Sequence, residues 1–338
     1  PVYKGIVVRL GDQREASILY DTELLRVAAG WNGFLKFDPA RFGVIVPPRI
    51  DGAVTFSTPR FPGVSLQEQF SNFREANPYG PLPKSVAHYE GLFRQGQRVV
   101  LKYSVGTGSA EAGGEQSSTA IQESPWLEQQ ADIKVITRTL RIEPSSVPIR
   151  LMVAYAAAKV RLHPRSESAS LIEQAGIGRA LVIAPHSKPV VIKLLSGSSD
   201  VNEAAMDKIV AASPAPEDLI ALTQPGSLLW GEPLVTRGEV AKPDPATEAN
   251  QFPYVVDTLT LPFENKFNAL FFCSGHDFFQ DGRAAVCNLH GDVWLVDGLD
   301  STLNRVTWRR FATGLFQPLG LKIVRDEVYV VGRDQITR

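Results

Sequence analysis

The sequence is poor in three features that mark large classes of proteins: cysteine, long apolar runs and an excess of charge of one sign. Its 338 residues contain only two cysteines, which excludes a disulfide framework and a cysteine-rich metal site. No segment approaches the roughly 20 consecutive apolar residues of a membrane-spanning helix. The 35 Lys and Arg residues balance 36 Asp and Glu residues. This balance argues against nucleic acid or an anionic membrane as a partner, because both attract basic surfaces.

The motifs of common cofactors and catalytic mechanisms are also missing. The sequence has no P-loop, no HExxH and no GxSxG, and the glycines at 106 and 108 do not lie between a strand and a helix as a dinucleotide fingerprint requires. It has no CxxCH, so this chain cannot attach a c-type haem covalently. We therefore expect neither a cofactor nor a metal in it. Because it begins with Pro1 and no signal peptide precedes that residue, we expect a longer precursor.

What the sequence does contain is a succession of short β-branched segments separated by glycine and proline. Residues 5–10, 16–20, 24–28 and 34–37 predict an antiparallel meander, and residues 98–105 and 133–142 predict further strands. Residues 201–212 have helical spacing after a capping serine and aspartate. We predict an all-β chain, with a β-sandwich-like domain of unknown function over 1–250. Loops are expected at 38–85 and 106–119, and a small helical insertion at 200–223.

The last part of the sequence, from about residue 251, contains a repeat. Val286 and Val330 occupy similar positions in two predicted hairpins and are 44 residues apart, while Val293 and Ile336 are 43 residues apart. Such spacings are typical of β-propeller blades. We therefore predict that residues 251–338 form the start of a β-propeller, about one and a half blades long. Since a ring needs at least about four blades, we expect the chain to be a fragment with an open edge.

Candidate binding residues cluster in this repeat region. His276 and Asp277 are neighbours at the mouth of the first predicted blade and could serve as a base or a ligand. The alternative is that Asp277 caps a turn and His276 packs at the edge of the blade. Gln317, Arg333 and Asp334 are the polar residues predicted to point toward the central channel. They are ligand-binding candidates, and no catalytic residue is supported.

The two cysteines fall in neighbouring predicted strands. Cys273 and Cys287 could form a disulfide in an oxidising compartment, because opposed strand positions can satisfy the geometry of the bond. The alternative is that both are small buried apolar residues.

The chain also resembles a known group of proteins. The segments DFFQDGRAAVCNLHGDVWLVDGL (277–299), WRRFATGLFQPLGLKIV (308–324) and VYVVGRDQITR (328–338) are similar to large secreted proteins of planctomycetes and related bacteria. Those proteins join a domain of unknown function to a propeller and often to a c-type haem domain. The propeller part is in turn similar to soluble quinoprotein sugar dehydrogenases and sorbosone-dehydrogenase-like proteins.

This resemblance implies a periplasmic or secreted protein linked to carbohydrate oxidation and electron transfer, whose parent would use haem c or a quinone. We expect this chain to be its N-terminal, catalytically incomplete portion, with carbohydrate and the remaining propeller and haem domains as partners. The alternative is a non-enzymatic β module that binds carbohydrate or protein. A glycoside-processing enzyme using Glu123, Glu128 or Asp132 is a third hypothesis, although nothing in the sequence pairs these carboxylates in space.

Overall fold

The computed structural model describes residues 2–37, 48–70, 81–107, 118–155, 157–224, 232–241 and 255–338. These residues form antiparallel sheets and two short helices, which confirms the predicted all-β fold. The chain divides into a first unit, residues 1–226, and a second unit, residues 227–338. The predicted domain boundary at residue 250 lies outside the described residues.

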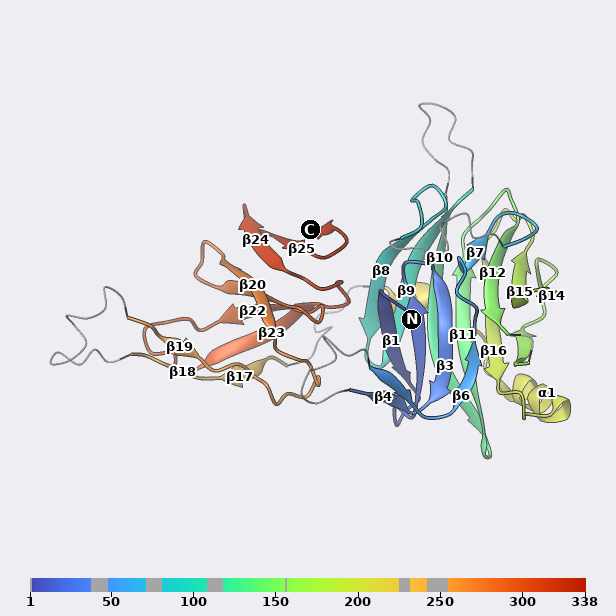
Figure 1. Ribbon diagram of the computed structural model, residues 1–338, viewed down its shortest axis with the longest axis horizontal. Coiled ribbons are helices and arrows are strands. Elements are labelled where there is room, and N and C mark those ends of the chain that lie inside the picture. Colours follow the sequence, from blue (N-terminus) through green and yellow to red (C-terminus); the bar gives the residue numbers. More distant parts are fainter. Residues whose placement is uncertain are drawn as a thin grey trace, which may run out of the picture. The chain divides into compact units, whose positions relative to one another are not determined.

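The first unit is a two-layer β-sandwich (Figure 1). One layer is a six-stranded sheet in the order β13-β16-β11-β10-β9-β8. Its strands are β8 (Ala87–Gln95), β9 (Arg98–Gly106), β10 (Ser118–Gln130), β11 (Ile133–Ile142), β13 (Lys159–His163) and β16 (Val190–Gly197).

Two four-stranded sheets make the other layer, in the orders β1-β2-β3-β6 and β14-β15-β12-β7. They are joined where the amide of Tyr155 donates to the carbonyl of Ser57, 2.9 Å away. The strands are β1 (Gly5–Leu10), β2 (Ala16–Asp21), β3 (Arg26–Asn32), β6 (Val54–Ser57), β7 (Val64–Ser65), β12 (Ile149–Ala154), β14 (Ala169–Gln174) and β15 (Gly178–Ile183). β4 (Phe34–Lys36) and β5 (Arg49–Asp51) pair with each other in a separate two-stranded sheet. In the sequence they lie between β3 and β6.

The core between the layers follows from the alternation of the strands. In β10, Ile121 and Leu127 point inward and are buried, as are Ile136 and Leu140 of β11. Together with residues of the opposite layer such as Ile18 they form one large apolar cluster. Burying alternate residues of two facing sheets is the usual way in which a sandwich acquires its stability.

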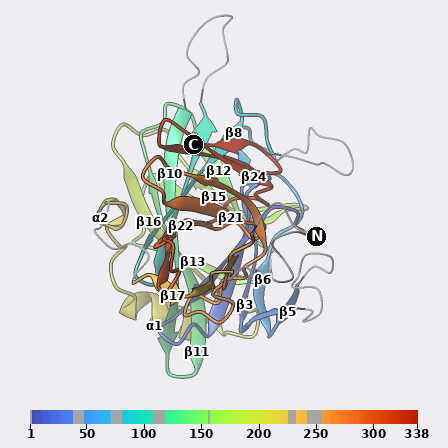
Figure 2. The same cartoon turned by 90° about the vertical axis from the view of Figure 1, so that its left-hand side faces the viewer.

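One difference from the sequence prediction and one agreement with it concern the segments around this core. Within 38–85, predicted as loops, the described residues contain the short strands β5, β6 and β7. These strands are only two to four residues long, too short for alternation to reveal them. The helices α1 (Glu203–Ala212) and α2 (Leu219–Leu222) lie within 200–223, where an insertion was predicted, beside the six-stranded sheet (Figure 2).

The second unit is built on a five-stranded sheet in the order β17-β23-β22-β21-β20. A three-stranded sheet, β24-β25-β26, and a short pair, β18-β19, accompany it. The strands are β17 (Leu234–Thr236), β18 (Gly238–Glu239), β19 (Thr258–Leu259), β20 (Cys273–Phe278), β21 (Ala284–Asn288), β22 (Val293–Asp297), β23 (Val306–Ala312), β24 (Gly320–Val324), β25 (Glu327–Val331) and β26 (Ile336–Thr337).

Apolar residues cover both faces of the five-stranded sheet. On one face the buried rings of Trp294, Trp308 and Phe271 pack together, and the indole of Trp308 donates to the hydroxyl of Thr236, 2.9 Å away. On the other face Cys287 and Val293 pack against Val330 of the three-stranded sheet. In the part of the chain that the structure describes, these sheets do not close into a ring.

Candidate functional site

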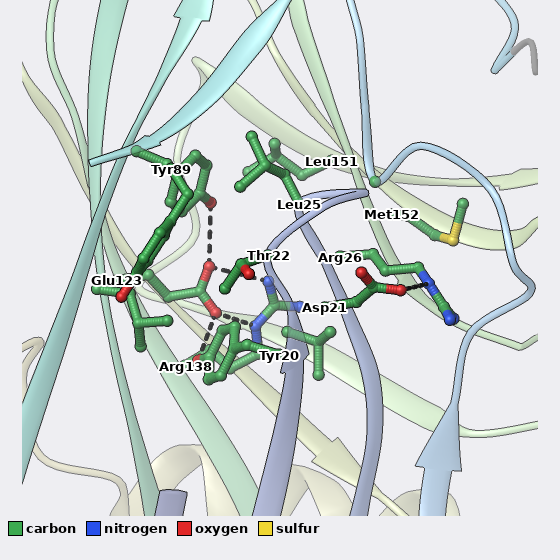
Figure 3. Close-up of a pocket in the computed structure, with 14 residues that line it drawn as sticks. Tyr20, Asp21, Thr22, Leu25, Arg26, Tyr89, Glu123, Arg138, Leu151 and Met152 are labelled. Atoms are coloured by element: carbon green, nitrogen blue, oxygen red, sulfur yellow. Dashed lines mark hydrogen bonds and ion pairs between the residues drawn. The ribbon is translucent and has the colours of Figure 1, made fainter. Parts of the chain in front are cut away.

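The most unusual chemistry in the described residues is a buried ionic cluster between the layers of the sandwich (Figure 3). The carboxylate of Glu123 on β10 accepts two hydrogen bonds from the guanidinium of Arg138 on β11. The Nε–Oε1 distance is 2.6 Å and the Nη2–Oε2 distance is 3.1 Å. The hydroxyls of Tyr20 and Tyr103 donate to the same two oxygens at 2.8 and 3.0 Å. Each carboxylate oxygen therefore accepts two hydrogen bonds.

Strand register brings these groups together. Glu123 has the same parity along β10 as the buried Ile121 and Leu127, so it must point into the core. Arg138 has the same parity along β11 as Ile136 and Leu140, and it lies diagonally across the strand pair from Glu123. The clue available in the sequence was thus a pair of opposite charges at apolar positions of two consecutive strands.

Burial and pairing both act on the ionisation of this cluster. Burial lowers the pKa of Arg138, but the charge and hydrogen bonds of Glu123 outweigh that effect and leave the pKa raised. Burial, followed by the negative charge of Glu123, raises the pKa of both Tyr20 and Tyr103 far above the usual value. Arg138 therefore stays charged, and the two phenols stay neutral.

A second buried pair lies beside it. The guanidinium of Arg26 donates to Asp21 at 3.2 Å, and its Nη1 also donates to the carbonyls of Thr58 and Pro59, each at 3.1 Å. Burial lowers the pKa of Arg26, and Asp21 partly offsets this. Both pairs line a cavity of about 20 Å³, which is room for roughly one water molecule.

This arrangement suits a structural role. A general base needs a lone pair that can reach a substrate, whereas the acceptor positions of Glu123 are already taken by donors from three strands. Glu128, another proposed glycosidase carboxylate, accepts from the ammonium of Lys193 at 2.8 Å. The third, Asp132, follows the end of β10 and lies outside both pairs.

The candidates of the second unit fall into separate places. His276 and Asp277 are consecutive on β20, so their side chains point to opposite faces of the sheet. The imidazole of His276 makes an edge contact with the ring of Phe278. Asp277 instead accepts from the amide of Ile323 and from the ammonium of Lys322, each at 2.8 Å, and these bonds lower its pKa to about 2. It joins β20 to β24.

Two of the predicted channel residues do meet. The guanidinium of Arg333 donates to the side-chain carbonyl of Gln317 at 3.2 Å, and the amide of Arg333 donates to the carbonyl of Phe316 at 2.9 Å. Asp334 lies in the same turn as Arg333, between β25 and β26. The contact between Arg333 and Gln317 connects the segment before β24 with that turn. Asp277 is not part of it, because its carboxylate binds Ile323 and Lys322.

The two cysteines are free thiols in this structure, Cys273 exposed and Cys287 buried. In the register of β20 and β21, Cys273 lies opposite Asn288 and Cys287 lies opposite Gly275. Burial raises the pKa of both thiols, and the neighbouring Cys287 raises that of Cys273 further. The disulfide itself stays a prediction.

Metal sites and membrane spans are two further features to consider in the described residues. Among them, no group of three or more His, Cys, Asp or Glu side chains could hold a metal ion. Over the same residues, none of the helices has the length and apolar character needed to cross a membrane.

Comparison with known families gives one match. Residues 18–111 match a family described as a domain of unknown function, DUF6797, which confirms that the chain carries such a domain. The matched segment runs from β2 to just past β9 and so includes Tyr20 and Tyr103 of the buried cluster, but neither Glu123 nor Arg138. No curated protein and no solved structure matches the chain.

Proposed function

We propose that this chain is the non-catalytic scaffold of a larger secreted protein linked to carbohydrate oxidation. In this proposal the second unit forms the opening blades of a β-propeller related to those of quinoprotein sugar dehydrogenases. The redox centre, a quinone or haem c, belongs to other domains of the parent protein. Planctomycete-type proteins with this domain order are the group that the sequence resembles.

The observation that carries the proposal is the structural repeat in the second unit. Strands β20, β21 and β22 pair in sequence order, and β24, β25 and β26 do the same. Val286 and Val330, 44 residues apart in the sequence, both lie on the second strand of their set. The first strands of the two sets, β20 and β24, approach each other closely at Gly275. Inner strands that converge are what a propeller requires near its axis.

Two further observations support a scaffold role. Among the described residues, the sheets of β20–β26 contain no strand from the first unit, as a separate propeller domain requires. Buried charges of the sandwich also form pairs of opposite charge, Glu123–Arg138 and Asp21–Arg26. Paired charges in a core are characteristic of structural sites rather than of poised catalytic groups.

The test compares this chain with the full parent protein. The visible spectrum is recorded with and without dithionite, and reduction of an electron-accepting dye is followed with a panel of sugars. We expect dye reduction by the parent and none by this chain, with or without added quinone. Sugar-dependent turnover by this chain alone, or a parent with neither turnover nor a reducible chromophore, would refute the proposal.

A second candidate function is a non-enzymatic module that binds carbohydrate or protein. It is favoured by the exposed phenylalanines of the second unit, among them Phe263 and Phe278, whose exposed fractions are 68% and 57%. Exposed aromatic rings are enriched at binding surfaces. Affinity electrophoresis in polysaccharide gels tests this function, with Phe278→Ser as the variant expected to lose retardation and Phe93→Ser on the first unit as its matched control.

A further inference from the structure

A row of three residues crosses the first set of repeat strands. Gly275 on β20 lies opposite Cys287 on β21, which lies opposite Val293 on β22. Cys287 and Val293 are buried, with exposed fractions of 0% and 1%. The next sheet covers this row: a Cβ atom on Gly275 would lie 2.7 Å from the amide nitrogen of Leu321 and 2.8 Å from the Cα of Gly320. Gly275 is therefore a position of close backbone approach.

The same row recurs one repeat later. Gly320 on β24 lies opposite Val331 on β25, which lies opposite Ile336 on β26. Strand by strand, these residues are equivalent to Gly275, Cys287 and Val293. Their surroundings differ, because Val331 is 47% exposed, Ile336 is 69% exposed, and a Cβ atom on Gly320 would meet nothing within 4 Å.

A glycine inside a strand is unfavourable unless the backbone needs its freedom or its lack of a side chain. Neither Gly275 nor Gly320 has a positive φ, so conformation does not require glycine at either position. At Gly275 the reason is the neighbouring backbone. At Gly320 no described residue supplies that reason, although the position, the cross-strand partners and the aliphatic character of the row are repeated.

We propose that Gly320, Val331 and Ile336 form the docking row for a third hairpin sheet of the same build. Its first strand would pass its backbone over Gly320, as β24 passes over Gly275. Its aliphatic side chains would cover Val331 and Ile336, as Val330 and its neighbours Leu321 and Val328 cover Cys287 and Val293. This inference rests on the propeller of the proposed function and names the surface through which that propeller continues.

The test supplies such a sheet and measures burial of the row. A duplicate of residues 299–338, which contains no cysteine, is added after Arg338 of the full chain. Val331→Cys places a thiol opposite Gly320, as Cys287 lies opposite Gly275 in the first row. The labelling rate of this thiol is measured in a Cys273→Ser background. We expect the extension to slow labelling by at least about tenfold, which corresponds to about 1.4 kcal/mol of docking free energy.

Glycine variants provide the controls. Gly320→Val should leave labelling and thermal stability unchanged in the unextended chain, where its Cβ has room, but should restore fast labelling in the extended chain. Gly275→Val, at the occupied row, should expose Cys287 to labelling in both chains.

Three results would overturn the inference. The first is fast labelling in an extended chain whose duplicate is folded, as judged by the fluorescence of its own copy of Trp308. The second is slow labelling without the extension that depends on protein concentration, since a second copy of the chain would then be the occupant. The third is continued protection of Cys287 in Gly275→Val. The dye assay remains a separate measure, so failure of this inference is distinguishable from failure of the proposed carbohydrate-oxidising role.

Discussion

Replacing Glu123 by Gln should destabilise the sandwich far more than a surface substitution of the same kind. The change keeps the shape of the side chain but removes its charge. It leaves the guanidinium of Arg138, whose side chain is 4% exposed, as an uncompensated cation in the core. It also replaces one of the two acceptor oxygens by an NH₂ group, which donates. The guanidinium of Arg138 and the hydroxyls of Tyr20 and Tyr103 can then no longer all find acceptors.

The expected cost follows from these losses. Removing one partner of a buried ion pair costs about 3–5 kcal/mol, because the other charge stays buried and unpaired. The double variant Glu123→Gln/Arg138→Met should cost less than the sum of the single changes, since the stranded cation is gone. The matched control is Glu90→Gln on β8, in the same sheet. Glu90 forms an exposed ion pair with Lys102 at 2.8 Å, and its loss should cost less than about 1 kcal/mol.

Native-state hydrogen exchange of β10 and β11 is the suitable assay, because it reports the unfolding free energy of the first unit separately from that of the second. The reasoning is refuted if Glu123→Gln shifts that free energy no more than Glu90→Gln does. That outcome would mean that water reaches the cluster and solvates the guanidinium of Arg138 once its carboxylate partner is removed.

Two further predictions concern other polar links. Asp277 has a lowered pKa, so its bonds to Ile323 and Lys322 stabilise the second unit above the unfolded pKa of about 3.9 and are lost as the pH falls toward about 2. Exchange protection of β24 should fall over that range, and Asp277→Asn should remove the pH step; a step that survives the substitution would contradict this. Lys193→Met should loosen the helical insertion, because the ammonium donates to Ser213 and to the carbonyl of Pro214 at 3.1 and 2.6 Å. Amides of α1 should lose about 1.5–3 kcal/mol of protection, while equal losses in α1 and β11 would show that Lys193 supports the sandwich instead.

The strands were largely predictable because the information is local. Residues 5–10 and 133–142 were predicted as strands and form β1 and β11, since alternation and β-branched residues act within one segment. The short strands β5 to β7 were missed for the same reason, as two to four residues carry too little pattern. Their pairing is decided by neighbours far away in sequence, such as Ala29 of β3 opposite Ser57 of β6.

The buried cluster could not be assembled from the sequence. Glu123 was recognised only as one of several carboxylates, although its parity with Ile121 indicates an inward position. That Tyr20 would reach it depends on how the two layers face each other, since donor and acceptor are 103 positions apart in the sequence. Conversely, residues adjacent in the sequence need not share a site. His276 and Asp277 are consecutive on β20, and their side chains point to opposite faces of the sheet.

The repeat was visible for a different reason. A repeated structural unit leaves a repeated sequence pattern, so the sequence can be compared with itself. The spacing between Val286 and Val330 then gives the period without knowledge of the fold. The structure adds what spacing alone could not: equivalent positions need not have equivalent surroundings. Gly275 and Gly320 share a place in the repeat, yet only the first is pressed by a neighbouring backbone. The proposed third sheet would give Gly320 the close backbone contact that β24 gives Gly275.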